Sequence, residues 1–302
     1  MRDHQLKAWL RLVETGSIRG AARSLHLSQA AITKAIRELE EDLDAPLIVR
    51  SSRGITLTEC GRQLTVRARQ SQNQLTLARQ DIRQLMGGEK ARVSVAVTPM
   101  VFLSVLPDVL RDFRRSIPLA DLTLEEGLMP AVLPALRAGT VDFAIAALIP
   151  ETLGSEFDFE PLKMLDVMIA GRRGHPLANA TRWEELVECD WLMQLSPGSQ
   201  HTFLLDQLQQ LGLPLPRRII KTNTFGVTSS LLVSTDAVST IPSSILKVGP
   251  QSEQLTRIPV DVPLRPLVLG IVTLRDNPLS LAATRFSNLF REALSRVNPA
   301  LD

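Results

Sequence analysis

Two short amphipathic segments separated by a tight turn, within residues 17–43, constrain the fold of this 302-residue chain more than any other feature. Apolar side chains recur at helical spacing after Ser17 and again after Ser28. A serine hydroxyl in front of such a segment accepts a backbone N–H, so both serines are predicted to be helix N-caps. Ala21 and Ala22 leave room for two helix backbones to cross at close range. The pattern therefore predicts a helix-turn-helix.

The outward face of the second helix carries side chains that suit nucleic acid. Its apolar face is assigned to Ala31, Ile32, Ala35, Ile36 and Leu39. The opposite face combines amide, hydroxyl and basic groups, which bind base edges and phosphates, with small residues that can approach the floor of a groove. The residues predicted to contact DNA on this helix are Ser28, Gln29, Ala30, Thr33, Lys34 and Arg37, with Ser28 favoured as a cap over a base contact.

A hairpin is predicted to follow the second helix. Pro46 suits the start of an edge strand, and Gly54 can adopt the left-handed conformation that a short hairpin loop needs. Arg50 and Arg53 flank that loop. Beside a helix-turn-helix, such a hairpin is a wing whose arginines reach phosphates or the minor groove. Without that neighbour, both would be ordinary solvated charges.

Charge is distributed unevenly along the chain. Residues 1–90 hold 15 Lys and Arg against 10 Asp and Glu, whereas the remainder holds 19 against 22. A basic excess of this size is modest and on its own fits ordinary surface charge. Together with the helix-turn-helix pattern, it places the attraction for a polyanion in the N-terminal part.

Residues 59–88 are predicted to form one long polar helix with Thr58 as its N-cap. Its apolar residues recur at alternating intervals of four and three, which is the seam of a coiled coil. The residues assigned to this dimerisation seam are Leu64, Ala68, Leu75, Ala78, Ile82 and Leu85. We favour pairing with a second copy over a helix packed on its own domain, because the polar face is wide and only a narrow stripe needs cover.

From residue 89 onward, strands alternate with helices, which predicts mainly parallel sheets covered by helices. The expected elements include strands at 92–98, 122–125, 141–148, 165–170 and 267–274, and helices at 101–113, 131–138, 202–211, 226–233 and 280–297. Because the last strand and helix exceed what two equal lobes need, we expect the chain to return to its first lobe. The lobes are assigned as lobe I, residues 91–161 and 268–302, and lobe II, residues 162–267, with crossings near 161–164 and 265–268.

A two-lobed α/β domain offers a ligand cleft at the carboxyl ends of its strands, where N–H groups at helix starts favour anions. The residues predicted to line it are Thr98, Pro99, Met100, Val101, Ala147, Ser196, Pro197, Gly198, Thr224 and Phe225. Thr98 is the preferred single contact. For the others, ordinary strand-to-helix caps remain an equal alternative.

The sequence lacks the motifs of an enzyme or a metalloprotein. It contains no nucleophile elbow, phosphate-binding loop or dinucleotide-binding motif, and its four histidines have no metal-ligand spacing. We therefore predict no catalytic residue, no metal site and no cofactor. Cys60 and Cys189 lie far apart without a CxxC partner, and Cys60 is assigned no redox role. The charged first residues and the short apolar runs predict a cytoplasmic chain with no membrane span.

Several motifs together resemble the LysR-type transcriptional regulators. They are AARSLHLSQAAITKAIRELEEDLDAPLIVRSSRGITLTECG at 21–61, EG at 126–127, LRAGTVDFAI at 136–145 and GHPLA at 174–178. The resemblance covers essentially the whole chain and implies an α/β protein in three parts: a winged helix-turn-helix at 1–58, a linker helix at 59–88 that pairs two subunits, and an effector-binding domain at 89–302 similar to periplasmic binding proteins. Members of this family usually assemble as tetramers built from two dimers, and the resemblance places an effector next to Thr98.

The chain departs from the family pattern at a few positions. Ala30, Ile48 and Cys60 stand where proline, phenylalanine and alanine are common, and none of these changes threatens the fold. Asp236 stands where glycine is common and leaves the turn there open. The regulatory half is weakly similar to members that sense aromatic acids or sulfonates.

These observations predict a transcription regulator that binds double-stranded promoter DNA and responds to a small, anionic organic effector in the cleft. The chain is expected to form a homodimer through the linker helix, then a homotetramer, and to work in the cytoplasm beside the nucleoid. Two alternatives are an architectural DNA-binding protein without an effector and a solute-binding protein with an appended basic domain. A secretory signal or a catalytic set would favour the second, and the sequence contains neither.

Overall fold

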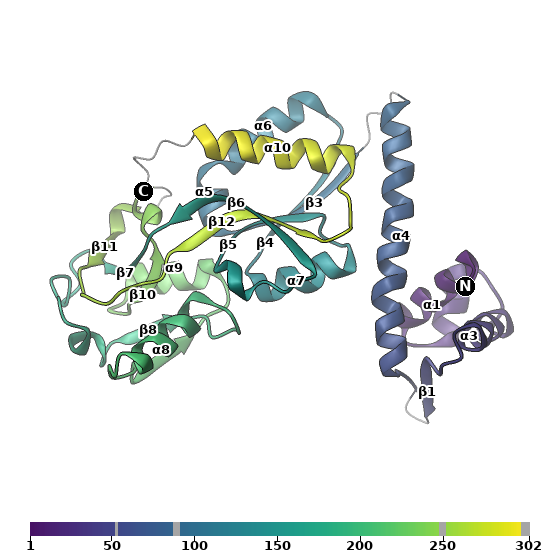
Figure 1. Ribbon diagram of the computed structural model, residues 1–302, viewed down its shortest axis with the longest axis horizontal. Helices are drawn as coiled ribbons and strands as arrows, with labels where there is room; N and C mark the ends of the chain where they lie inside the picture. Colours follow the sequence, from purple (N-terminus) through teal and green to yellow (C-terminus); the bar gives the residue numbers. More distant parts are fainter. Residues whose placement is uncertain (52–53, 87–90, 248–251, 297–302) are drawn as a thin grey trace. The chain divides into compact units, whose positions relative to one another are not determined.

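The computed structural model describes residues 1–51, 54–86, 91–247 and 252–296 (Figure 1). The chain folds into two compact units: the first contains residues 1–79 together with Arg137–Gly139, and the second contains the rest, so the division falls within the long helix α4 (Glu59–Leu85). The first unit is mainly helical, and the second combines β-sheets with helices. The predicted α/β class is confirmed.

The first unit contains the predicted helix-turn-helix. Its elements before α4 are α1 (Asp3–Thr15), α2 (Ile18–Leu25), α3 (Gln29–Leu43), β1 (Ile48–Ser51) and β2 (Gly54–Leu57). Both predicted caps are present. The hydroxyl of Ser17 accepts a hydrogen bond from the backbone N–H of Gly20 at 3.0 Å, and that of Ser28 accepts one from Ala31 at 3.1 Å.

A small core joins the three helices to the start of α4. Ala21 is fully buried, as the close crossing of α2 requires. Trp9 of α1 is also fully buried, and its indole N–H donates to the hydroxyl of Thr65 in α4 at 3.2 Å. Leu64 and Ala68 pack in the same core. The first turns of α4 are therefore part of the winged-helix domain.

The hairpin is tied to the helices at two points. The carboxylate of Glu40 accepts hydrogen bonds from the backbone N–H groups of Leu47 and Ile48 at 2.8 and 3.3 Å. A Cβ atom at Gly61 would lie 2.2 Å from the carbonyl oxygen of Leu47, so only glycine lets α4 begin this close to the strand. The wing and α4 are thus held together by backbone geometry.

The first lobe of the second unit is built on a five-stranded sheet. Its strands are β3 (Arg92–Val97), β4 (Asp121–Glu126), β5 (Phe143–Leu148), β6 (Phe157–Leu165) and β12 (Leu267–Leu274), in the order β4-β3-β5-β12-β6. β3 pairs in parallel with β4 and β5, whereas β12 is antiparallel to both of its neighbours. The late strand β12 sits between two earlier strands, which confirms that the chain returns to the first lobe.

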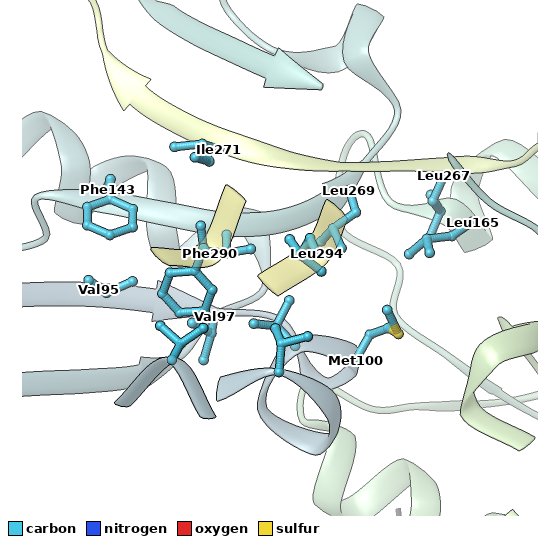
Figure 2. Close-up of a cluster of buried hydrophobic side chains, with 14 of the residues drawn as sticks. Val95, Val97, Met100, Phe143, Leu165, Leu267, Leu269, Ile271, Phe290 and Leu294 are labelled. Atoms are coloured by element: carbon cyan, nitrogen blue, oxygen red, sulfur yellow. The ribbon is translucent and has the colours of Figure 1, made fainter. Parts of the chain in front are cut away.

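Helices cover both faces of this sheet. They are α5 (Pro99–Ser104), α6 (Leu106–Ser116), α7 (Met129–Ala138) and α10 (Leu281–Arg296). Helices α6 and α10 lie on one face and α7 on the other (Figure 1). On the α10 side, Phe113 and Phe286 stack with ring centroids 4.6 Å apart. Figure 2 shows this cluster extending from Phe143 and Phe290 to Met100.

The second lobe is smaller. Its elements are β7 (Val167–Arg172), β8 (Asp190–Met193), α8 (Gln200–Gln210), β9 (Arg218–Lys221), α9 (Phe225–Ser234), β10 (Ser239–Pro242) and β11 (Leu255–Ile258), with short 3-10 turns at Trp183–Leu186, Ser243–Leu246 and Ser252–Gln254. β10 and β11 flank β7 antiparallel, and β8 pairs with β9 in parallel. Trp183 and Trp191 pack against each other in its core, with ring centroids 5.1 Å apart.

Several sequence expectations are corrected here. The five-stranded sheet is mixed, the β10-β7-β11 sheet is antiparallel and, of the sheets described, only the β8-β9 pair is wholly parallel, so the sheets are not mainly parallel. The helix predicted at 101–113 is two helices, α5 and α6, because Pro107 at the start of α6 favours a new first turn. Strands β6 and β11 were not predicted. β6 stays paired with β12 as far as Leu165, so the first crossing between lobes falls at Asp166 and not at 161–164.

Candidate functional site

The face of α3 predicted to contact DNA is exposed to solvent. Ser28, Gln29, Ala30, Lys34 and Arg37 are exposed and Thr33 is half-buried, whereas Ile32, Ala35, Ile36 and Leu39 are buried. The assignment of Ala31 to the apolar face is wrong, because Ala31 is exposed. It lies in the first turn of α3, one turn before Ala35, where α3 has fewer neighbours to pack against.

Both basic residues on α3 already have acidic neighbours. The ammonium of Lys34 lies 3.8 Å from a carboxylate oxygen of Glu38, with 77% of the Lys34 side chain exposed, and Arg37 donates to Glu41 at 2.7 Å. The hydrogen bond that Arg37 donates to Glu41 raises the pKa of Arg37 above its usual value. Exposed pairs of this kind contribute little to stability, so both cations can exchange a carboxylate for a phosphate at small cost.

The wing is only partly described. Arg50 is in β1, where its Cα pairs with that of Ile55 in β2. Arg53 lies outside the described residues. The hairpin itself is confirmed, and the contacts of both arginines with DNA remain predictions.

Helix α4 carries an exposed apolar stripe beyond the winged-helix core. Leu75, Ile82 and Leu85 are 53%, 62% and 75% exposed, and Ala78 is exposed as well. The first two predicted seam residues are not exposed like the others: Ala68 is buried and Leu64 is half-buried against the core of their own domain. The stripe open to a partner is therefore Leu75, Ala78, Ile82 and Leu85.

A cleft of about 380 Å³ lies between the two lobes of the second unit. Eight of the ten residues predicted to line it do so: Thr98, Pro99, Met100, Ala147, Pro197, Gly198, Thr224 and Phe225. The prediction that Val101 and Ser196 line the cleft is wrong. Val101 points into the hydrophobic core and is fully buried, and Ser196 turns its hydroxyl toward the side-chain amide of Gln194 at 3.4 Å.

Buried polar atoms without a partner gather at this cleft. Among the described residues, five buried side-chain polar atoms lack a hydrogen bond, and three of them belong to cleft residues: Thr98 Oγ1, Thr240 Oγ1 and Gln200 Nε2. Thr98 stands at the N-cap of α5 yet makes no capping bond, whereas Thr224 caps α9 by accepting from Val227 at 3.3 Å. The capping alternative therefore explains Thr224 and does not explain Thr98.

His201 is a cleft residue that the sequence did not reveal. Its Nδ1 accepts a hydrogen bond from the backbone N–H of Gln194 at 3.2 Å, and its Nε2 lies 3.3 Å from the hydroxyl of Ser239. That hydroxyl donates to the carbonyl of Leu192 at 2.7 Å, so the imidazole proton is assigned to Nε2. Burial lowers the pKa of His201 to about 4. The ring is therefore neutral at pH 7.

Other lining residues were also missed. They include Leu128, Met129, Pro130, Leu133, Ile149, Leu153, Thr222, Thr228, Ile241, Pro242, Ile245 and Leu267. A signal was present for Leu128 and Met129, which follow the carboxyl end of β4, a parallel strand next to β3. Residues after β10 reach the cleft from an antiparallel strand, which the rule used for parallel strands does not cover.

Contacts between the lobes close the cleft at its rim. The carboxylate of Glu126, at the end of β4, accepts a hydrogen bond from the backbone N–H of Phe225, the first residue of α9, at 3.1 Å. The ring of Phe225 packs edge-on against Phe102, with centroids 6.2 Å apart. A Cβ at Gly198 would lie 3.1 Å from Thr152, so the loop before α8 also approaches the first lobe closely.

Within the described ranges, no cluster of three or more His, Cys, Asp or Glu side chains could hold a metal ion. Nor is any helix of these ranges both long and apolar enough to cross a membrane. The sites that the structure provides are thus the exposed face of α3 and the cleft between the lobes.

A winged helix-turn-helix followed by a long helix and a two-lobed α/β domain defines a class of bacterial DNA-binding regulators. Residues 4–62 match the family described as "Bacterial regulatory helix-turn-helix protein, lysR family", and residues 86–295 match "LysR substrate binding domain". The chain belongs to the LysR family of transcriptional regulators, which are DNA-binding proteins and not enzymes.

Similar proteins span the full length of the chain. It is 28% identical over 293 residues to the HTH-type transcriptional regulator GalR of Pseudomonas putida, covering 96% of this chain and 74% of that protein. It is 24% identical over 291 residues to the regulator TdcA of Escherichia coli, covering 96% and 93%. Among solved structures, a full-length OxyR variant of Pseudomonas aeruginosa gives a TM-score of 0.65 at 18% identity, covering 98% of this chain and 95% of that one. Full-length CbnR complexed with its target DNA gives 0.63 at 22% identity, covering 97% and 100%.

Proposed function

We propose that this LysR-family chain regulates transcription by placing α3 of each subunit of a symmetric pair in the major groove of promoter DNA, and that a small molecule in the cleft changes how the pair binds. The effector half of this proposal is carried by one observation: three residues that line the cleft, Thr98, Thr240 and Gln200, each have a buried polar atom without a hydrogen-bond partner. Each lacks a hydrogen bond that water would supply in the unfolded chain, and a bound ligand can restore it.

The DNA half rests on the exposed face of α3. Gln29 and Thr33 are proposed to contact base edges, and Ala30 leaves room for the helix to approach the groove. The proposed phosphate contacts are Lys34, Arg37, Arg50 and Arg53. Ser28 keeps its capping hydroxyl on Ala31 and is proposed to lie at the groove entrance.

Pairing of subunits is proposed to use the exposed stripe on α4. A twofold pair places its two recognition helices on half-sites separated by one helical turn, about 34–36 Å, or a multiple of it. The family resemblance supports a tetramer of two such dimers. Since its partner is promoter DNA, the protein is proposed to work in the cytoplasm beside the nucleoid.

Selection of binding sites from a random duplex pool tests the DNA half. The full-length chain is expected to enrich a near-palindrome whose half-sites are one or more helical turns apart, and footprinting is expected to protect both halves. Enrichment of unpaired half-sites, or of no sequence, would contradict the proposal that a symmetric pair of subunits binds the DNA.

Filling the cleft tests the effector half. Ala147→Trp places an indole in the cleft, whereas Ala131→Trp, an exposed position of α7 that does not line the cleft, is the matched control. The selected site is placed before a reporter, and expression is compared across growth media. Ala147→Trp is expected to bind the site as tightly as the parent and to lose the dependence on medium, with Ala131→Trp behaving as the parent. Unchanged regulation in Ala147→Trp would favour the architectural alternative, in which no effector acts.

A further inference from the structure

The cleft carries no charged side chain. Its lining contains no Lys, Arg, Asp or Glu among the residues that the structure describes. The only lining side chain that could become cationic near pH 7 is His201, and burial lowers its pKa to about 4. Both of its ring nitrogens already face partners within the protein. An ionised ligand would therefore find no opposite charge to offset its lost hydration.

The starts of α9 and α8 at the cleft are already partly occupied by groups of the protein. At α9, the carboxylate of Glu126 already accepts the hydrogen bond of the first N–H group, that of Phe225, and it adds a negative charge beside the rim. Thr224 takes the N–H of Val227 in the same turn. At α8, Ser199 accepts from Thr202. The partial positive charge left at the start of α8 suits the oxygen of a neutral group better than it offsets a full charge.

The remaining lining is mostly apolar and comes from both lobes. The side chains of Met129, Leu133 and Leu153 lie on the first lobe, and those of Ile241 and Ile245 on the second. Polar side chains interrupt this surface, and three of them, Thr98, Thr240 and Gln200, carry a buried polar atom without a partner. Thr98 and Thr240 are only 6% and 4% exposed, and their hydroxyls, like the amide of Gln200, have no partner.

We propose that the effector of this chain is an uncharged, largely apolar molecule whose hydroxyl, carbonyl or amide group accepts hydrogen bonds from Thr98, Thr240 and Gln200. This inference rests on the proposed function of the cleft and goes beyond it by naming the ligand class. The sequence predicted an anionic effector, because helix starts favour anions. The structure favours a neutral effector, because the start of α9 already binds the carboxylate of Glu126.

Three probes with one apolar body and different charges test the proposal. They are 3-phenylpropanamide, 3-phenylpropanoate and 3-phenylpropylammonium, which are neutral, anionic and cationic at pH 7. Each is titrated against the full-length chain, and binding is read from the rise in melting temperature and from calorimetry. The amide is expected to bind saturably and about tenfold or more tightly than either ion, since neither ion finds a countercharge.

Two isosteric variants locate the binding. Thr240→Val removes one hydroxyl without changing side-chain volume much, and it is expected to weaken amide binding about fivefold to tenfold. Thr98→Val gives the same test from the other lobe and serves if Thr240→Val does not fold. The matched control is Thr256→Val, in β11 of the same sheet as Thr240 but outside the cleft lining, and it is expected to bind as the parent does.

The outcomes separate this inference from the function on which it rests. Binding of either ion as tightly as the amide, or no saturable binding of the amide, overturns the neutral-ligand proposal. Ion binding that is lost in Thr240→Val keeps the cleft as the effector site while overturning its ligand class. Failure of the folded parent chain to bind any selected DNA site removes the proposed function itself, whatever the probes do.

Discussion

The two binding surfaces of this protein use polar side chains in opposite ways. On α3, Lys34 and Arg37 are exposed and held only by weak surface ion pairs. In the cleft, Thr98 and Thr240 are buried, uncharged and unpartnered. We expect the first surface to attract DNA over long distances and to be sensitive to salt, and the second to select its ligand by short-range hydrogen bonds that salt hardly affects. The two proposed sites would then combine electrostatic attraction with exclusion of charge.

The largest effect is expected from removing a side chain from the hydrophobic core of the first lobe. Phe286 is fully buried and packs against Phe113, so Phe286→Ala is expected to cost about 3–5 kcal/mol of the free energy of unfolding of the α/β unit. Calorimetric unfolding of the full chain measures it. Phe286→Leu is the milder control and is expected to lose less of the free energy of unfolding. If Phe286→Ala equally lowered the unfolding transition of the winged-helix unit, the two surfaces would not belong to separately stable parts.

The next largest effect on stability is expected from lowering the pH, which acts through His201 in the cleft wall. The pKa of His201 falls from 6.5 to about 4 on folding, so the folded chain binds fewer protons than the unfolded chain between these values. Stability from this residue is complete above pH 6.5 and is lost as the pH falls toward 4, by at most about 3 kcal/mol. Urea unfolding at a series of pH values tests this, and His201→Gln is expected to flatten that part of the profile. A His201→Gln profile as steep as the parent's would show that the ring is not held neutral by the cleft wall.

A base-reading residue on α3 is expected to have a smaller effect. Gln29→Ala is expected to change sequence preference at one position of each half-site, by about 1–3 kcal/mol per lost base contact. Competition binding with single-base variants of the selected site measures it. A uniform loss across all variants would instead assign Gln29 to the phosphate backbone.

The smallest expected effect, and the sharpest test of the contrast, is the salt response of Lys34→Ala. Losing one phosphate contact is expected to weaken binding on all sequences and to lower the slope of log affinity against log salt by about one for each subunit. Binding isotherms at several salt concentrations supply the slope. Lys7→Ala, outside the proposed surface and paired with Asp3 in α1, is the control. An unchanged slope for Lys34→Ala would mean that the assigned face is wrong.

The winged helix could be predicted closely because its signals are local. Ser17 and Ser28 mark helix starts within one turn of the groups that they cap, and both caps are present. The exposure of Gln29 and Arg37 follows from their spacing relative to Ile32 and Ile36. Ala31 was predicted wrongly because spacing alone does not show where along a helix the packing against its neighbours begins.

The cleft could be predicted only in part because its residues come from distant segments. Thr98 and Ala147 follow from the carboxyl ends of parallel strands. His201 and Thr240 reach the cleft through α8 and through the antiparallel strand β10, whose position depends on packing of the whole lobe. The absence of charge from the described lining is likewise a property of the assembled wall, and no single segment reveals it.

Anchoring of α4 in the winged-helix core has a mechanical consequence. The bond between Trp9 and Thr65, together with the tight approach at Gly61, makes the first turns of α4 rigid with the domain that carries α3. With 27 residues, α4 is about 40 Å long. Over that length, a rotation of about 5° corresponds to a displacement of roughly 3.5 Å at the far end. We expect the first turns of α4 to move together with α3, so that a change in the tilt of this end of the helix changes the direction of α3.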